Sequence, residues 1–193
     1  MNAAAMQDEL PIEEPEVPGK LTEADMIEAL EQRYSATAGN GRRYATAYGV
    51  RSRAGFDARR TADFVAMDLW PSKGLLLHGH EVKVSRSDWL RELKEPEKAA
   101  EFMPYMNCWW LVASDPRIVR TGELPDDWGL LVMHGGLLVV RKPAPKREAK
   151  PLTRSRLAAL LRAVAQTAEY RGRRQAEREA RRRCERLGHV ESA

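Results

Sequence analysis

Cysteine is scarce in this chain: among 193 residues only Cys108 and Cys184 are cysteines, and they lie in different segments. Their spacing excludes a disulfide framework and offers no Cys-X-X-Cys pair for a zinc ribbon. No apolar run approaches the ~18 residues that a transmembrane helix needs, and the first residues lack the basic-then-apolar pattern of a secretion signal. We therefore expect a soluble, cytoplasmic protein with no membrane partner.

The sequence signatures of several enzyme classes are also missing. There is no phosphate-binding P-loop, no dinucleotide-binding glycine fingerprint and no nucleophile-elbow pattern of glycine and serine. Acyl transfer and NTP hydrolysis are therefore poor explanations of this sequence.

The charge that is present is unevenly distributed. Residues 1–20 carry five acidic residues and one lysine (net −4), residues 21–140 carry 15 basic and 17 acidic residues (net −2), and residues 141–193 carry 16 basic and six acidic residues (net +10). The basic C-terminal segment suggests a polyanionic partner, and a solvated helix face is the alternative explanation.

The composition divides the chain into four segments. Residues 1–20 contain three prolines and an acidic cluster, which predicts a disordered acidic leader, and residues 21–141 have the apolar content of one folded domain. Residues 142–151 read as a semi-rigid, proline-containing linker. Residues 152–193 predict a basic helical segment whose first part carries apolar residues at helical spacing and can dock on the domain.

Periodicity and turn residues predict an α/β fold with a mixed sheet. Thr22 followed by Asp25 is the signature of a helix N-terminus, and Ser85 followed by Asp88 is another. The expected elements, in chain order, are a helix at 22–34, strands at 44–50, 62–67 and 74–85, helical stretches after Ser85 and from Pro96 to 105, a strand at 108–113 and a hairpin of 128–133 with 137–141. The order is helix, three strands, helix and strand, followed by the added hairpin and the basic C-terminal helix.

One of these strands carries an unusual pair of charges. Glu81 and Lys83 lie two positions apart in an apolar run, so in a strand both point to the same face. The turn before this run lets the preceding strand place an aspartate beside Glu81. Asp63 lies on that strand and Asp68 at its exit, where aspartate commonly starts a turn. The two lie five positions apart and therefore on opposite faces, so only one of them can face Glu81.

A carboxylate pair with a neighbouring ammonium group suits metal-dependent phosphate chemistry. Mg²⁺ is commonly held by one or two carboxylates together with water and substrate phosphate oxygens, and Mn²⁺ accepts similar ligands. Lys83 could orient the attacking water and offset charge on the phosphate. A structural ion pair between Glu81 and Lys83 is the alternative.

The pattern Asp63…Glu81-Val82-Lys83 resembles the PD-(D/E)XK nuclease signature. Roughly residues 44 to 140, including the continuation Ser-Arg-Ser-Asp-Trp-Leu after the strand, resemble the MmcB-like DNA repair branch of that superfamily, found also in phage and actinobacteria. The resemblance implies a restriction-endonuclease-like core. Two positions depart from the pattern: Ala62 replaces the proline, and Asn107-Cys108 stands where related chains often carry Cys-Asp.

The resemblance also implies roles for individual residues. Asp63, Glu81 and the carbonyl of Val82 would hold Mg²⁺ or Mn²⁺, Lys83 would be the catalytic lysine, and the first helix often supplies a further acid, for which Glu31 is the candidate. The remaining candidates would contact nucleic acid and are Arg59, Arg60, Ser85, Lys98, Arg173, Arg174, Arg181 and Arg182.

The sequence therefore predicts a metal-dependent nuclease that hydrolyses DNA phosphodiester bonds in repair or processing. Two alternatives remain: a catalytically silent module of the same fold that binds nucleic acid or serves as a scaffold, and a nuclease directed at RNA. The oligomeric state stays unknown at this stage.

Overall fold

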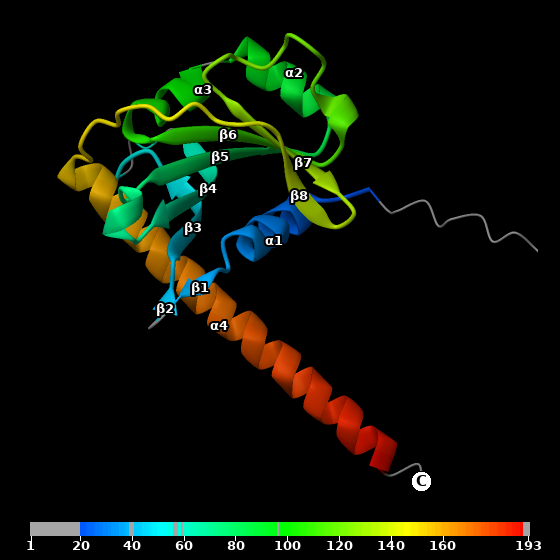
Figure 1. The fold of residues 1–193 in the computed structure, drawn as a ribbon. Helices are drawn as coiled ribbons and strands as arrows, with labels where there is room; N and C mark the ends of the chain where they lie inside the picture. The colour runs from blue at the N-terminus through cyan, green and yellow to red at the C-terminus, as the bar shows by residue number, and fades with distance from the viewer. Residues whose placement is uncertain (1–19, 39–40, 56–57, 59, 96, 191–193) are drawn as a thin grey trace, which may run out of the picture.

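The computed structural model of the protein describes residues 20–38, 41–55, 58, 60–95 and 97–190, without the side chains of Ala38, Lys98 and residues 186–190. The expected leader lies outside the described residues except for Lys20. The elements in chain order are α1 (Glu23–Arg33), β1 (Thr37–Ala38), β2 (Gly41–Arg42), β3 (Tyr44–Arg51), β4 (Thr61–Asp68), η1 (Pro71–Lys73), β5 (Leu77–Lys83), α2 (Arg86–Lys94), α3 (Glu97–Ala100), η2 (Met103–Tyr105), β6 (Cys108–Ala113), η3 (Pro116–Ile118), β7 (Gly129–His134), β8 (Leu137–Lys142) and α4 (Arg154–Val190) (Figure 1).

A mixed six-stranded sheet forms the centre of the molecule. Its spatial order is β3-β4-β5-β6-β7-β8, which follows the chain order (Figure 1). The pairs β5–β6 and β6–β7 are parallel, whereas the β3–β4, β4–β5 and β7–β8 pairs are antiparallel. The prediction of an α/β fold with a mixed sheet is confirmed, as are the predicted strands at 44–50, 62–67 and 108–113 and the C-terminal hairpin. The strand expected at 74–85 is shorter and begins at Leu77, because Gly74 and Leu75 adopt positive φ angles in the turn before it. No described helix is both long and apolar enough to cross a membrane.

Helix α1 covers one face of the sheet. It begins at Thr22, whose hydroxyl accepts a hydrogen bond from the backbone N–H of Asp25 while the Asp25 carboxylate accepts one from the backbone N–H of Thr22. Met26 and Leu30 of this helix are completely buried in a cluster that includes Phe64. The capping box fixes where the helix starts, and the apolar stripe fixes which side of it meets the sheet.

The other face of the sheet is covered by α2, α3 and the start of α4. Trp89 of α2 is completely buried there with Trp109 of β6. Gly79 of β5 makes this packing possible, because a Cβ at that position would overlap the ring of Trp109. The glycine therefore reflects the close approach of the Trp109 ring to the backbone of β5 rather than a need for backbone flexibility.

The segment after β8 lies against the domain instead of spanning a gap as the linker prediction implied. The backbone N–H of Arg147 donates to the carbonyl of Asn107 (2.9 Å), and that of Lys150 donates to the carbonyl of Pro104 (2.7 Å). Ala144 and Leu152 pack against the two apolar clusters. Three of the ten residues 142–151 are prolines, which carry no backbone N–H, and the N–H groups of Arg147 and Lys150 hold the segment to the domain.

Helix α4 docks on the domain through its first half and then leaves it. Ala159, Ala163 and Thr167 are buried, and the hydroxyl of Thr167 accepts a hydrogen bond from the backbone N–H of Tyr48 in β3. Beyond residue 171, every described side chain of the helix is exposed or half-buried. Figure 1 shows this part of α4 extending past the sheet.

Candidate active site

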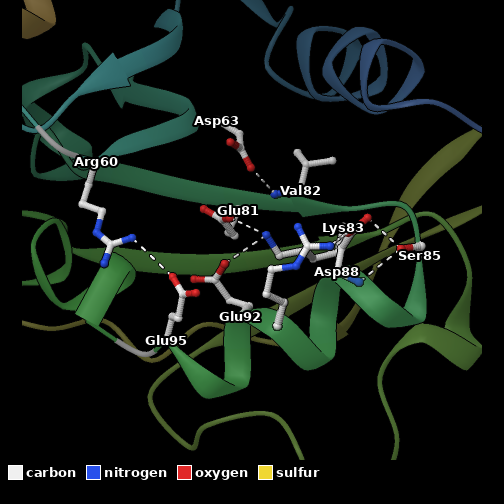
Figure 2. A network of polar contacts seen from close by, with 10 residues as sticks. Arg60, Asp63, Glu81, Val82, Lys83, Ser85, Asp88, Glu92 and Glu95 are labelled. Carbon is white, nitrogen blue, oxygen red and sulfur yellow. Dashed lines mark hydrogen bonds and ion pairs between the residues drawn. The ribbon is translucent and has the colours of Figure 1, made fainter.

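A cavity of about 330 Å³ opens where β5 ends and β4 begins. Strand β4 contributes Asp63, strand β5 contributes Glu81 and Lys83, and helix α2 closes the far wall (Figure 2). The described residues that line it are Glu23, Asp63, Glu81, Val82, Lys83, Val84, Asp88, Arg91, Glu92 and Glu95. This set contains six carboxylates and two cationic side chains, so the cavity is strongly acidic.

Lys83 is held between two buried carboxylates. Its Nζ atom lies 2.5 Å from Oε1 of Glu81 and 3.0 Å from Oε2 of Glu92 (Figure 2). The side chains of Lys83, Glu81 and Glu92 are only 9%, 2% and 7% exposed. The shared strand face predicted for Glu81 and Lys83 is confirmed. Glu92, from α2, was not predicted.

Asp63 is the aspartate that reaches this cavity. Its Oδ2 atom accepts a hydrogen bond of 2.7 Å from the backbone N–H of Val82 (Figure 2). Asp68 lies on the opposite face of β4, where its Oδ2 atom is 2.6 Å from a guanidinium nitrogen of Arg43. That ion pair and the N–H of Trp70 hold the pKa of Asp68 below its usual range. The structure therefore resolves the choice between the two aspartates in favour of Asp63.

Burial and charge repulsion strongly perturb Glu81. Burial, and secondarily the negative charge of Asp63, raise the pKa of Glu81 to about 7, although the ammonium group of Lys83 opposes this. The ionised form of Glu81 is thus poorly stabilised by the protein alone. A divalent cation placed between the two carboxylates would offset this repulsion.

The donor set of the cavity fits a hard divalent cation. Across the part of the chain that the structure describes, no group of three or more His, Cys, Asp or Glu side chains is arranged to hold a metal ion. Asp63 and Glu81 form a pair, which matches the one or two carboxylates that Mg²⁺ uses alongside water and phosphate oxygens. Lys83 lines the same cavity and supplies a positive charge that could bind a phosphate oxygen beside the metal.

The prediction for Glu31 is wrong. Its carboxylate lies 2.5 Å from Nε of Arg171 in α4 and does not line the cavity. The acidic residue that α1 brings to the cavity is Glu23, in the first turn after the Thr22 cap. Eight positions separate Glu23 from Glu31, which is about 12 Å along a helix, so only one end of α1 can reach the site.

The other predicted contacts fall in different places. Arg60 forms an ion pair of 3.5 Å with Glu95 at the rim of the cavity (Figure 2). The hydroxyl of Ser85 caps α2 by accepting from the N–H of Asp88 at 3.1 Å, and it also donates to the carboxylate of that residue at 2.6 Å. Arg59 and the side chain of Lys98 lie outside the described part of the chain.

The four predicted arginines of α4 lie far along the chain from the cavity residues and do not line it. Arg174 is 3.8 Å from a carboxylate oxygen of Glu28, and Arg181 pairs with Glu185 on its own helix at 3.0 Å. Arg173 and Arg182 are exposed.

Comparison with known proteins supports the fold only. No protein-family model matches this chain, and no curated protein matches it. Among solved structures, it is similar to the SPO1766 protein of unknown function from Silicibacter pomeroyi, with a TM-score of 0.52. The two sequences are 17% identical, and the match covers 81% of this chain and 90% of that chain. The similarity extends over most of both folds and carries no information about activity.

Proposed function

We propose that this protein is a metal-dependent nuclease that hydrolyses DNA phosphodiester bonds. The observation that carries the proposal is the convergence of Asp63, Glu81 and Lys83 in one acidic cavity at the end of β5. The element order α1-β3-β4-β5-α2-β6 supports it, because the PD-(D/E)XK resemblance implies this succession of helix, three strands, helix and strand.

Asp63 and Glu81 would hold Mg²⁺ or Mn²⁺, with the carbonyl of Val82 as a further ligand. When bound, the metal would lower the pKa of a coordinated water and withdraw charge from the scissile phosphate. The backbone N–H of Val82 fixes the orientation of the Asp63 carboxylate from the neighbouring strand. This hydrogen bond pre-organises one ligand without adding a charge to the cavity.

Lys83 has two carboxylate partners, and this determines how it could act. If Glu81 turns toward a metal ion, Glu92 still holds the ammonium group at 3.0 Å. Lys83 can then direct a hydrogen bond at the attacking water or at a phosphate oxygen. Glu92 thus acts as a positioning residue that holds the Lys83 side chain over the cavity.

The acidity of the cavity makes the metal a requirement for substrate binding there. Six carboxylates against two cationic side chains among the described lining residues would repel a phosphate. A bound divalent cation reduces that repulsion and provides the direct attraction for phosphate oxygens. The proposal therefore demands that cleavage depend strictly on divalent metal.

The test is cleavage of labelled single-stranded, duplex, forked and mismatched DNA, and of RNA of the same sequences, with Mg²⁺, Mn²⁺ or EDTA. Asp63→Asn, Glu81→Gln and Lys83→Ala should each lower the cleavage rate by about 10³-fold or more, and double variants should lose little more, because the groups act together. Glu97→Gln, the same type of change on the exposed surface of α3, is the matched control and should cleave normally.

Two outcomes would replace the proposal. If the protein binds DNA without metal and cleaves none of the substrates, the nuclease proposal is wrong and the protein is a catalytically silent binding module. If only RNA is cleaved, the proposed chemistry of the site stands and its substrate is RNA rather than DNA.

A further inference from the structure

One face of α4 changes its chemistry where the helix leaves the domain. Leu160, Ala163, Val164 and Thr167, which are buried or half-buried, lie within about 100° of one another on a helical projection. On the same projection this arc continues through five arginines. They are Arg171, Arg174, Arg178, Arg181 and Arg182.

The domain uses only the first part of this arginine face. Arg171 donates from Nε to Glu31 (2.5 Å) and to the hydroxyl of Tyr48 (2.9 Å), which fastens the helix to α1 and β3. Glu28 of α1 lies 2.9 Å from Arg178 and 3.8 Å from Arg174. One carboxylate thus faces two guanidinium groups, and the groove of about 660 Å³ between α1 and α4 keeps a positive excess at these positions.

Farther along α4, the face projects beyond the reach of α1. Arg181 pairs only within its own helix, and Arg182 has no ion pair with any described residue. The apolar side chains of this stretch, Ala176 and Ala180, fall on the opposite side of the helix. Over its described residues, the projecting face therefore has guanidinium groups, one carboxylate, that of Glu185 paired with Arg181, and no apolar centre.

These properties favour a nucleic acid over an acidic protein as the partner. Protein interfaces bury an apolar core at their centre, which this face lacks. A guanidinium group can donate two parallel hydrogen bonds to the oxygens of one phosphate. A row of arginines along a straight helix can therefore bind successive phosphates of a nucleic acid without contacting its bases.

We infer that the face formed by Arg174, Arg178, Arg181 and Arg182 binds the phosphate backbone of a nucleic acid lying in the angle between α1 and α4. The inference rests on the proposed function, for which it names a second contact with the same substrate. Arg171 serves mainly to dock the helix and is not part of this binding face.

The position of this face predicts a dependence on substrate length. Arg171 contacts Thr46 and Tyr48 of β3. The cavity lies toward the C-terminal end of β3, where Arg51 pairs with Thr61 of β4. The distance along β3 and α4 from the level of Asp63 to Arg182 is on the order of 25 Å. Because DNA rises 3.4 Å per base pair, a substrate must extend at least about seven base pairs beyond the cavity to reach the end of the face.

The experiment compares two double variants of the full chain with equal loss of charge. Arg178→Gln with Arg182→Gln changes the proposed face. Arg173→Gln with Arg183→Gln changes other sides of the same exposed stretch, because Arg173, although a candidate contact from the sequence, falls outside the arc of the face on the helical projection. Binding to a 30-base-pair DNA duplex and to the matching RNA duplex is measured by fluorescence anisotropy in EDTA across a salt series, and cleavage of a six-nucleotide DNA is measured separately with Mg²⁺. Circular dichroism checks that the helix content is retained.

The face variant should bind the long DNA about tenfold more weakly near 100 mM salt, and its slope of log affinity against log salt should fall by about 2, as expected for two lost phosphate contacts. The control variant should change affinity by less than twofold. In cleavage assays with Mg²⁺, a six-nucleotide DNA held in the cavity is too short to reach the face and should not distinguish the variants. Glu28→Gln should tighten binding because it removes the acid that competes for Arg174 and Arg178.

Equal losses in the two double variants would overturn the inference, since net charge alone would then explain binding. Tighter binding of polyglutamate than of either duplex would also overturn it, in favour of an acidic protein. Cleavage assays separate this result from the proposed function. A face-specific loss of binding without any nuclease activity refutes only the nuclease, whereas cleavage with no face-specific loss refutes only the role of α4.

Discussion

Replacing Glu81 by glutamine should stabilise the metal-free protein at pH 8 and not at pH 4.5. Burial and the charge of Asp63 raise the pKa of Glu81 from 4.5 to about 7, so the folded protein holds this proton more tightly than the unfolded chain does. Unfolding therefore becomes easier as pH rises from about 4.5 to about 7, and no further loss occurs above that range. Glutamine is neutral throughout and removes this loss.

The size of the effect follows from the two pKa values. At about 1.4 kcal/mol for each tenfold change in a protonation constant, ionising Glu81 costs the folded state about 3 kcal/mol by pH 8. For a protein of this length that corresponds to about 6–12 °C in Tm. Lys83 keeps its ion pair with Glu92 in the variant, so the substitution does not leave the ammonium group without a carboxylate.

Urea and thermal unfolding of both proteins in EDTA at pH 4.5, 6 and 8 measure this difference. Other acidic groups titrate in both proteins, so only the variant-minus-wild-type difference is interpreted. Added Mg²⁺ at pH 8 should stabilise the wild type more than the variant and reduce the gap. A difference that stays constant from pH 4.5 to pH 8 would show that Glu81 ionises normally and would refute the electrostatic account of the cavity.

Three further substitutions test other parts of the structure. Glu92→Gln removes one of the two carboxylates around Lys83 and should lower kcat by about tenfold with little change in KM, as steady-state cleavage assays would show. Gly79→Ala places a Cβ against the ring of Trp109 and should cost about 3 kcal/mol or more in urea unfolding. Thr22→Ala removes the cap of α1 and should cost about 1 kcal/mol in the same assay. A normal kcat for Glu92→Gln would contradict the positioning role of Glu92. Unchanged stability for Gly79→Ala or Thr22→Ala would contradict the packing at Gly79 or the capping by Thr22.

Local signals in the sequence were sufficient to predict most of the elements. Thr22 with Asp25, and Ser85 with Asp88, mark helix starts because each pair satisfies backbone N–H groups that the first helical turn leaves without partners. Alternation of side chains along β5 placed Glu81 and Lys83 together, because a strand leaves only two choices of face.

Relations between distant segments could not be predicted in the same way. The error over Glu31 arose because both Glu23 and Glu31 lie on α1, and only its packing on the sheet decides which end meets the cavity. Glu92 was missed because no short-range pattern links a residue in the second turn of α2 to Lys83. The proline-rich segment after β8 looked like a linker because its hydrogen bonds are made to residues more than 35 positions earlier in the chain.

The buried charges of the cavity argue for a role beyond stability. A cluster such as Glu81, Lys83 and Glu92 loses most of its hydration on folding, and apolar residues of similar volume commonly stabilise a protein as well or better. Stability alone therefore gives no reason for acids to gather here, especially when burial raises the pKa of one of them to about 7. A site that must hold a cation and present an ammonium group to a phosphate needs this arrangement, and the strain among its carboxylates is what metal binding would relieve. This reasoning favours the nuclease over the catalytically silent module, and strict dependence of cleavage on both Asp63 and a divalent metal is the result that it requires.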